Sequence, residues 1–370
     1  MTFSTPIPLG LYIHIPWCVK KCPYCDFNSH AASDALPERE YIDALLSDLE
    51  QDLQSMEGRI VETIFIGGGT PSLFSPESIE RLLVGVTKQL SLEKDAEITL
   101  EANPGTVESG KFAEFSAAGI NRLSIGVQSF KDDALRRLGR IHSAKDALRA
   151  AEQAHDAGLN NFNLDLMFGL PTQTPKDAIR DLANAVSLEP THISWYQLTL
   201  EPNTHFHHSP PGNLPSEETL WKIQQQGQEF LAQHAFWQYE ISAYAKDSYQ
   251  CQHNLNYWQF GDYLGIGAGA HGKLTNAPEQ KIHRSWKVKQ PKDYLNDATN
   301  EKRISGQKSL SREEAPFEFM MNALRLNDGF ETEIFQQHVG LPISIIEKQL
   351  KQAEEKEWIT WDLKRIKPTD

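Results

Sequence analysis

Three cysteines lie within eight residues of one another, in the pattern Cys18-x3-Cys22-x2-Cys25. Three thiolates from one short segment can hold three irons of a cubane 4Fe–4S cluster, which leaves the fourth iron open to an exchangeable ligand. Structural zinc is the main alternative, and it usually takes four ligands in two pairs. No second pair is evident, although His14 or His30 could complete such a site. The spacing therefore favours a cluster over zinc or a chance crowding of thiols.

The composition is acidic, with 36 Lys and Arg against 50 Asp and Glu and a formal net charge of −14 over 370 residues. An acidic chain without a basic run is not typical of nucleic-acid binders, so we expect no nucleic-acid partner. The N-terminus lacks the pattern of a secretory signal, and no apolar stretch approaches the ~20 residues of a spanning helix. We therefore expect a cytoplasmic protein, in which crowded cysteines more often bind metal than form disulfides.

Short apolar runs alternate with amphipathic helical patterns over the first 200 residues. The expected strands are Leu11–Ile15, Glu62–Ile66, Glu97–Glu101, Arg122–Val127, Asn163–Phe168 and Ile193–Thr199. The expected helices lie near 42–53, 76–90, 107–118, 143–157 and 174–187. Six such units imply an α/β fold with a parallel sheet and right-handed crossovers. Because a full eightfold barrel typically needs ~250 residues, a partial (β/α)6 barrel of the TIM type fits better.

Polar or glycine-rich sequence follows several of these strands. The residues concerned are His14 beside the cysteines, Gly67–Thr70, Glu101–Asn103, Gln128 and Asp165. Binding sites of parallel α/β folds collect at the carboxyl ends of the strands. We therefore expect these groups to face one cavity together with the cysteines.

We expect three regions along the chain. Residues 1–200 form the partial barrel with the cluster loop, and residues 201–287 extend it. Residues 288–370 comprise a polar linker, over 288–310, and a small C-terminal α+β domain of winged-helix-like type. Smaller expected features are a loop over 200–214, a helix near 217–234, a strand over 239–245, helices over 312–326 and 341–355, and strands over 357–361 and 364–367.

A glycine-rich tract near residue 270 nominally fits a dinucleotide-binding fingerprint, as Gly267-x-Gly269-x-x-Gly272. That fingerprint must open a helix that follows a first strand. The sequence after it, HGKLTNAPEQ, is unlike a helix. We therefore reject a dinucleotide site and expect a loop beside the barrel that faces an adenine.

The segment LYIHIPWCVKKCPYCDF (residues 11–27) resembles the cluster loop of radical S-adenosylmethionine (SAM) proteins. More narrowly, the chain resembles the family of the oxygen-independent coproporphyrinogen III oxidases. Further matching motifs occur in the same order: FIGGGTPS (65–72), LEANPG (100–105), RLSIGVQSF (122–130), LGRIH (138–142), NLDLMFGLP (163–171) and YLGIGAGAH (263–271). Several motifs in order are a far more specific signal than the cysteine spacing alone.

The resemblance implies roles for particular residues. It assigns Cys18, Cys22 and Cys25 to a 4Fe–4S cluster whose open iron binds the amino and carboxylate groups of SAM. The residues it assigns to cofactor binding are Tyr12, Tyr24, Gly68, Gly69, Thr70, Glu101, Gln128, Arg140 and Asp165. Arg140, the arginine among these residues, can pair with a carboxylate through charge-assisted, bidentate hydrogen bonds.

Two features depart from the oxidases and favour a subgroup of the family. The oxidases carry a fourth cysteine where this chain has Phe27, and they have an N-terminal arm for which the sequence ahead of Cys18 leaves no room. The motif His253-Asn254-Leu255-Asn256-Tyr257-Trp258 resembles that of the HemW group, the haem chaperones of the family. This resemblance makes His253 the candidate haem ligand, and a neutral imidazole is a common axial ligand. We expect Cys251, two residues earlier, to be a buried small hydrophobe.

The resemblance implies a haem chaperone that binds haem and transfers it to an acceptor protein, with respiratory proteins among the candidates. The alternative is an oxidase-like radical SAM enzyme of porphyrin biosynthesis, for which an electron from the cluster would cleave SAM. A radical enzyme acting on RNA is disfavoured by the charge of −14. Further expected partners are a flavodoxin-type electron donor and a second copy in a homodimer. Peripheral association with the inner membrane is also left open.

Overall fold

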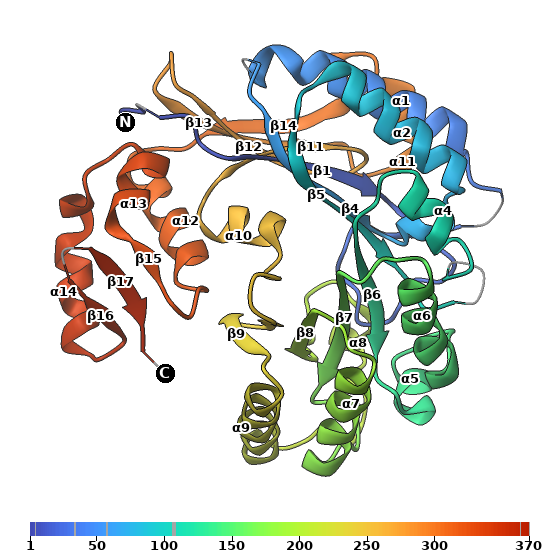
Figure 1. Cartoon of the computed structure of the whole chain (residues 1–370). Coiled ribbons are helices and arrows are strands. Elements are labelled where there is room, and N and C mark those ends of the chain that lie inside the picture. The colour runs from blue at the N-terminus through green and yellow to red at the C-terminus, as the bar shows by residue number, and fades with distance from the viewer. Residues whose placement is uncertain (4, 33–34, 57, 106–108, 363, 370) are drawn as a thin grey trace.

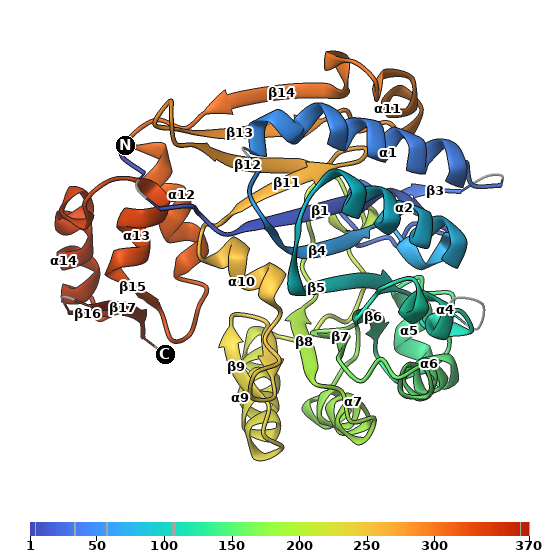
Figure 2. The ribbon, with the colours of Figure 1, turned by 45° about the horizontal axis from the view of Figure 1, so that its top comes forward.

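The computed structural model describes residues 1–3, 5–32, 35–56, 58–105, 109–362 and 364–369. Within this part of the chain, twelve strands form one curved sheet, shown in Figures 1 and 2, in the order β14-β13-β12-β11-β1-β4-β5-β6-β7-β8-β10-β9. The six strands expected from the sequence form its parallel centre: β1 (Leu9–Ile15), β4 (Val61–Gly68), β5 (Leu92–Ala102), β6 (Arg122–Gln128), β7 (Phe162–Phe168) and β8 (His192–Gln197). The expected partial barrel is confirmed.

The sheet continues beyond these six strands at both edges. A strand from the glycine-rich tract, β11 (Asp262–Ile266), runs parallel to β1, and it was not predicted. Antiparallel strands follow it: β12 (His271–Asn276), β13 (Lys281–Lys287) and β14 (Ile304–Ser309). At the other edge β10 (Ala243–Ala245) and β9 (Trp237–Glu240) form an antiparallel hairpin where one strand was expected. No helix begins at the glycine-rich tract, in agreement with the rejected dinucleotide site.

The helices cover the convex face of the sheet (Figure 1). They are α1 (Glu38–Asp52), α2 (Pro76–Gln89), α4 (Phe112–Ala117), α5 (Asp132–Arg137), α6 (Ala144–Asp156), α7 (Pro175–Ser187) and α9 (Glu217–Gln233). Capping residues mark where several of these helices begin. The Ser75 side chain accepts the Ser78 N–H at the start of α2, and capping boxes begin α6 at Ser143 and α7 at Thr174. No helix of the described residues has the length and apolarity needed to cross a membrane.

The polar stretch over 288–310 is not a linker. It contains α11 (Pro291–Asp297) and the sheet strand β14. The side chains of β14 are mostly exposed, so its composition resembles that of a loop although its backbone pairs with β13. The stretch over 200–214 likewise contains a short helix, α8 (His205–His208).

The C-terminal region packs a helical layer on a small sheet. Its elements are α12 (Glu314–Ala323), α13 (Thr332–Val339), α14 (Glu347–Glu355), β15 (Phe330–Glu331), β16 (Ile359–Trp361) and β17 (Arg365–Pro368). Phe319 lies at the centre of its apolar core, with its ring 4.9 Å from that of Phe330 and 5.1 Å from that of Phe335. The same core includes Phe3 and Phe260, so the C-terminal region is joined to the chain's start and to the barrel.

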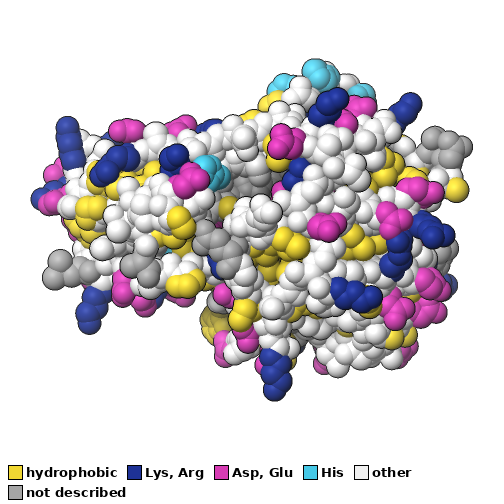
Figure 3. All heavy atoms as spheres, turned by 90° about the horizontal axis from the view of Figure 1, so that it is seen from above, with side chains coloured by type: hydrophobic (Ala, Val, Ile, Leu, Met, Phe, Trp, Pro, Cys, Tyr) yellow, Lys and Arg dark blue, Asp and Glu magenta, His cyan; other side chains and the backbone are white. Residues whose placement is uncertain are grey.

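Charged side chains of both signs are scattered over one face of the molecule. On the face shown in Figure 3, lysines and arginines lie among aspartates and glutamates. The concave side of the sheet faces α10 (Gln252–Trp258), as Figures 1 and 2 show. The functional groups expected from the sequence lie on this concave side or at its rim.

Candidate functional site

A cavity of about 340 Å³ lies at the carboxyl ends of the parallel strands. It brings together most of the residues that the sequence predicted to bind the cluster and SAM: Cys18, Cys22, Tyr24, Cys25, Gly68, Gly69, Thr70, Glu101, Gln128, Arg140 and Asp165. Tyr12 lines an adjoining cavity of about 540 Å³. The two cavities share four wall residues, Phe27, Gly68, Glu101 and Trp258.

The cluster loop is held at both ends by short strands. β2 (Trp17–Cys18) pairs with β3 (His30–Ala31), and a turn inside the loop is closed by the Cys25 N–H donating to the Cys22 carbonyl at 3.1 Å. The Arg140 guanidinium donates to the Cys22 sulfur across 3.6 Å. The loop thus presents its thiols to the cavity beside a fixed positive charge.

The donor set fits a 4Fe–4S cluster. All three cysteines are free thiols on the wall of one cavity, and the buried Nε–H of Arg140 has no hydrogen-bond partner among the described residues. No three His, Cys, Asp or Glu side chains of the described chain converge as ligands of one metal ion. A cubane does not need such convergence, because each thiolate binds a different iron.

The glycine loop after β4 approaches the cluster loop too closely for side chains. Gly68 has φ +113°, and a Cβ there would clash with the His14 ring. A Cβ on Gly69 would lie 2.5 Å from the Trp17 carbonyl oxygen. The Gly68 N–H donates to Glu101 Oε2 at 2.9 Å. Glycine is therefore required for the backbone itself to form this wall of the cavity.

Two acidic groups in the cavity wall carry raised pKa values. Burial raises the pKa of Glu101 to about 7, although the Gly68 N–H stabilises its charged form. Burial also raises the pKa of Asp165, although hydrogen bonds from Asn163 and Ser124 stabilise its charged form and act in the opposite direction. A carboxyl in this state can accept hydrogen bonds from an ammonium or hydroxyl group of a cofactor, which would lower its pKa on binding.

A hydrogen-bonded chain fixes the remaining polar groups. Thr70 Oγ1 accepts from Asn103 Nδ2 at 2.9 Å, and Asn103 Oδ1 accepts from Arg140 Nη2 at 2.6 Å. On the neighbouring strands the Tyr196 hydroxyl donates to Gln128 Oε1 at 2.9 Å. These contacts hold the donors and acceptors in place before any ligand arrives.

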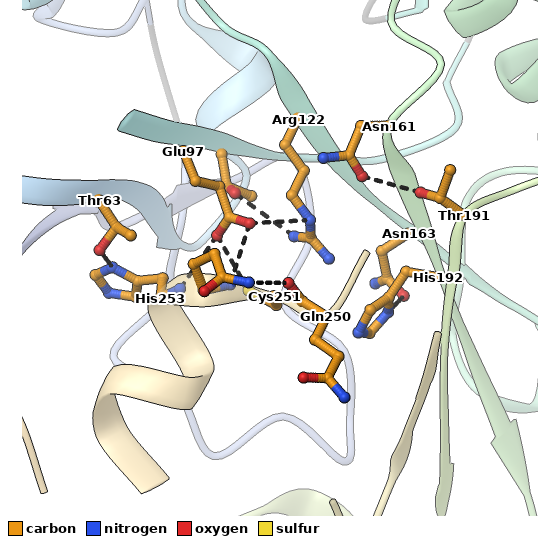
Figure 4. A network of polar contacts seen from close by, with 12 residues as sticks. Thr63, Glu97, Arg122, Asn161, Asn163, Thr191, His192, Gln250, Cys251 and His253 are labelled. Carbon is orange, nitrogen blue, oxygen red and sulfur yellow. Dashed lines mark hydrogen bonds and ion pairs between the residues drawn. The ribbon is translucent and has the colours of Figure 1, made fainter. Parts of the chain in front are cut away.

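His253 lines neither of these two cavities and lies close to Thr63 and Glu97, as Figure 4 shows. Its side chain is fully buried, with Nδ1 hydrogen-bonded to Thr63 Oγ1 at 2.8 Å and Nε2 to the Tyr257 hydroxyl at 3.0 Å. Burial lowers its pKa to about 3. Both ring nitrogens are engaged and none is accessible. Haem ligation by His253 therefore stays a prediction, and it would require these hydrogen bonds to break.

Glu97 and Arg122 form a buried group that the sequence did not single out. Glu97 Oε1 accepts the N–H of His253 and Oε2 that of Gln252, both at 3.1 Å, so the carboxylate caps the start of α10 (Figure 4). Arg122 Nε lies 3.8 Å from the same carboxylate. Cys251 is fully buried beside it, as expected, and burial raises the pKa of this thiol to about 12. The sequence signal that could have identified this group was a glutamate, Glu97, at a strand position that faces the protein interior.

The other members of the HNxxYW motif do reach the cavities. Asn254 lines the smaller cavity, Tyr257 the larger one, and Trp258 both. Arg325, from the end of α12, stacks over the Trp258 ring at 4.2 Å. The motif therefore builds a wall between the cofactor cavity and the C-terminal region.

Comparisons with known proteins agree with this geometry. Residues 12–184 match the model of the Radical SAM superfamily, and residues 310–370 match that of the HemN C-terminal domain. The solved structure of coproporphyrinogen III oxidase (HemN) from Escherichia coli superposes with a TM-score of 0.82 at 24% identity, covering 98% of this chain and 87% of that one. That likeness shows the fold, and fold and site together define a radical SAM protein, with a 4Fe–4S cluster and SAM as its cofactors.

Two relatives align over almost the full chain. The protein named "Heme chaperone HemW" from Escherichia coli is 51% identical over 353 residues, covering 95% of this chain and 92% of that protein. The protein of the same name from Haemophilus influenzae is 52% identical over 356 residues, with 95% and 91% covered. The chain belongs to the HemW family. These relationships favour that family over the oxidases.

Proposed function

We propose that this protein binds haem and transfers it to an acceptor protein, on a radical SAM scaffold. The observation that carries the proposal is the identity of about half of all residues, over 95% of the chain, with a protein named as a haem chaperone. The exposed Phe27 adds support, because it occupies the position of the oxidases' fourth cysteine and lines both cavities.

In this proposal the cavity at the strand ends holds the cluster and SAM. Cys18, Cys22 and Cys25 would hold the cluster through their thiolates, with SAM bound beside it. When bound, the cluster would supply electrons next to the sulfonium group of SAM. The Gly68–Thr70 backbone and Glu101 hold the amino group and ribose, while Arg140 balances the charge of the thiolates or a carboxylate. Tyr12, Tyr24, Gln128 and Asp165 complete the walls.

The finer expectations extend the same proposal. A reducible cluster calls for an electron donor, for which a flavodoxin-type protein is the proposed partner. Respiratory haemoproteins are the proposed acceptors, and a homodimer is the proposed assembly. The proposed location is the cytoplasm, with peripheral contact at the inner membrane.

Anaerobic reconstitution with iron and sulfide, followed by titration with ferric haem, tests the proposal. We expect saturable, stoichiometric haem uptake and no conversion of coproporphyrinogen when SAM and a reductant are added. The triple variant C18S/C22S/C25S serves as the cluster-free control. Turnover of coproporphyrinogen to a vinyl product, or haem uptake no greater than that of an unrelated protein, would contradict the proposal.

A further inference from the structure

Ser29 lies four residues after the last cysteine of the cluster loop, and neither the sequence motifs nor the proposed function gives it a role. It lines the 340 Å³ cavity and is only 4% exposed. Its hydroxyl oxygen lies 3.5 Å from the Cys25 sulfur. No other hydrogen-bond partner of this hydroxyl occurs among the described residues. A buried hydroxyl whose single partner is a cluster cysteine indicates a role toward the cluster.

The direction of this hydrogen bond follows from the state of the cysteine. In the free thiol, either the sulfur or the hydroxyl could be the donor. A thiolate that ligates iron has no proton, so its sulfur can only accept. With the cluster bound, the Ser29 hydroxyl is therefore the donor, and the positive end of its O–H dipole faces the Cys25 sulfur.

A second cluster sulfur also has a side-chain donor. Arg140 Nη1 donates to the Cys22 sulfur, and Nη2 of the same guanidinium donates to Asn103 Oδ1 at 2.6 Å and to the Gly126 carbonyl at 2.8 Å. These two contacts fix the orientation of the guanidinium. Cys22 and Cys25 thus each receive a hydrogen bond, from donors that lie far apart in the sequence.

The chain on both sides of Ser29 is fixed in place. The next residue begins β3, which pairs with β2. On the other side, Asn28 Nδ2 donates to the carbonyl oxygens of Ala268 and Lys289, both at 2.9 Å. A Cβ on Gly269 would lie 2.3 Å from this nitrogen, so the contact requires glycine there. The glycine-rich tract therefore anchors the cluster loop beside Ser29 and limits the positions that its hydroxyl can take.

A hydrogen bond to a ligating sulfur affects how readily a cluster is reduced. Hydrogen bonds to the sulfurs and solvent exposure are among the factors that set the reduction potential of Fe–S clusters. One-electron reduction adds a negative charge that is shared with the sulfurs. A donor dipole at a sulfur stabilises this added charge, and its effect is larger where burial lowers the local dielectric. Loss of such a donor should therefore lower the reduction potential.

We propose that Ser29 is a positioning residue for the cluster, whose hydroxyl donates to the Cys25 thiolate and raises the reduction potential. The inference rests on the part of the proposed function that places the cluster on the three cysteines, and it does not depend on haem transfer. A higher potential eases reduction by a one-electron donor of the flavodoxin type. In that step one electron passes from the reduced flavin to the cluster, and no atom is transferred.

Redox titration of the reconstituted full-length protein, followed by the electron paramagnetic resonance of the reduced cluster, tests this role. We expect Ser29→Ala to lower the equilibrium constant for one-electron reduction by about tenfold, which is a shift of about 59 mV to lower potential. Ser29→Thr and Ser29→Val have the same shape and differ in the hydroxyl. Threonine should keep the wild-type potential and valine should lower it. Because the resonance comes from assembled clusters alone, incomplete reconstitution of a variant does not prevent the measurement.

Ser129→Ala is the matched control. Ser129 is also buried, and its hydroxyl donates to Asp181 Oδ2 at 2.8 Å, but it lines neither the 340 Å³ nor the 540 Å³ cavity. This variant should lose stability and keep the wild-type potential, because a structural defect away from the cluster does not change the charge at its sulfurs.

The outcomes separate the inference from the function on which it rests. If the wild type assembles no cluster, the cluster assignment fails and the inference fails with it. If the wild-type cluster forms and Ser29→Ala and Ser29→Val keep its potential, or Ser129→Ala lowers the potential equally, the inference alone is overturned. Haem uptake by the wild type tests the chaperone function separately.

Discussion

Glu101 shows how the fold perturbs a single residue of the cofactor cavity. Its pKa is raised to about 7 from an ordinary value of 4.5, chiefly by burial. Between these two values the folded protein holds a proton that the unfolded chain has lost. The free energy of unfolding therefore falls as the pH rises from about 4.5 to 7.

Glu101→Gln removes this titration. We expect the variant to gain stability relative to the wild type at pH 8, by the order of 1–3 kcal/mol, and to lose that advantage at pH 5. Denaturant unfolding of the cluster-free proteins at both pH values measures the difference. The exposed Glu93 on the same strand provides a control substitution, Glu93→Gln. An equal Glu101→Gln effect at both pH values would refute the raised pKa.

His253 is the motif residue whose ring nitrogens are both hydrogen-bonded inside the protein. We expect His253→Ala to cost about 2–4 kcal/mol, because it leaves a cavity and deprives Thr63 and Tyr257 of their partners. Since its pKa is lowered to about 3, the wild type loses stability as the pH falls from about 6.5 towards 3, and the variant should lose less. Chemical unfolding between pH 4 and 7 measures both effects, with the exposed His234→Ala as control. Haem affinity lost without any loss of stability would restore His253 as the ligand.

Motif resemblance predicted which residues meet at the cofactor cavity, and the structure brings them together. The sequence could not predict which histidines have ring nitrogens without hydrogen-bond partners. His253 and His271 both follow recognisable motifs, yet partners from β4 and α10 engage the first, whereas the second has none in the described chain. Thr63 is distant from His253 in the sequence, so only the folded chain shows that both ring nitrogens of His253 are engaged.

At the scale of elements, α10 depends on a carboxylate from β5. Glu97→Gln should destabilise the protein by about 1–3 kcal/mol, because Arg122 would then be buried without its counter-charge and the start of α10 would lose its cap. Hydrogen exchange of the amides of residues 252–258 should speed up more than that of the central strands. Unchanged protection of these amides would show that Glu97 does not hold the helix.

The glycine loop gives a second prediction at this scale. Gly68→Ala should lower SAM affinity by more than about tenfold, because its Cβ would clash with His14 and displace the wall of the cavity. Gly158→Ala is the matched control, with φ +73° and open space around its Cβ. Calorimetric titration with SAM after anaerobic reconstitution distinguishes the two. Equal affinity in the two variants would remove the loop from the SAM site.

Element prediction from the sequence succeeded where strands are continuous buried apolar runs, and it failed where the side chains of a strand are mostly exposed or are glycines. The six central strands are apolar runs that the helices must cover. β14 was expected to be part of a linker because most of its side chains are exposed. The seventh parallel strand, β11, was obscured by its glycines, of which Gly265 is required because a Cβ there would clash with the His271 carbonyl.

At the scale of the whole molecule, three hollows meet at one residue, Trp258. The 340 Å³ cofactor cavity and the 540 Å³ cavity share Phe27 and Trp258, and a groove of about 750 Å³ beside α12 also reaches Trp258. The C-terminal region supplies α12 to that groove and packs its core against Phe3 and Phe260.

Transfer of haem out of this protein tests the central claim most directly. The reconstituted, haem-loaded protein is mixed with a haem-free b-type haemoprotein, and the absorbance spectrum of the acceptor is followed over time. The account predicts that the acceptor gains its haem spectrum while the donor loses its own, with no chemical change to the macrocycle. A donor that takes up no haem, retains it in the presence of the acceptor, or alters the porphyrin would contradict the account.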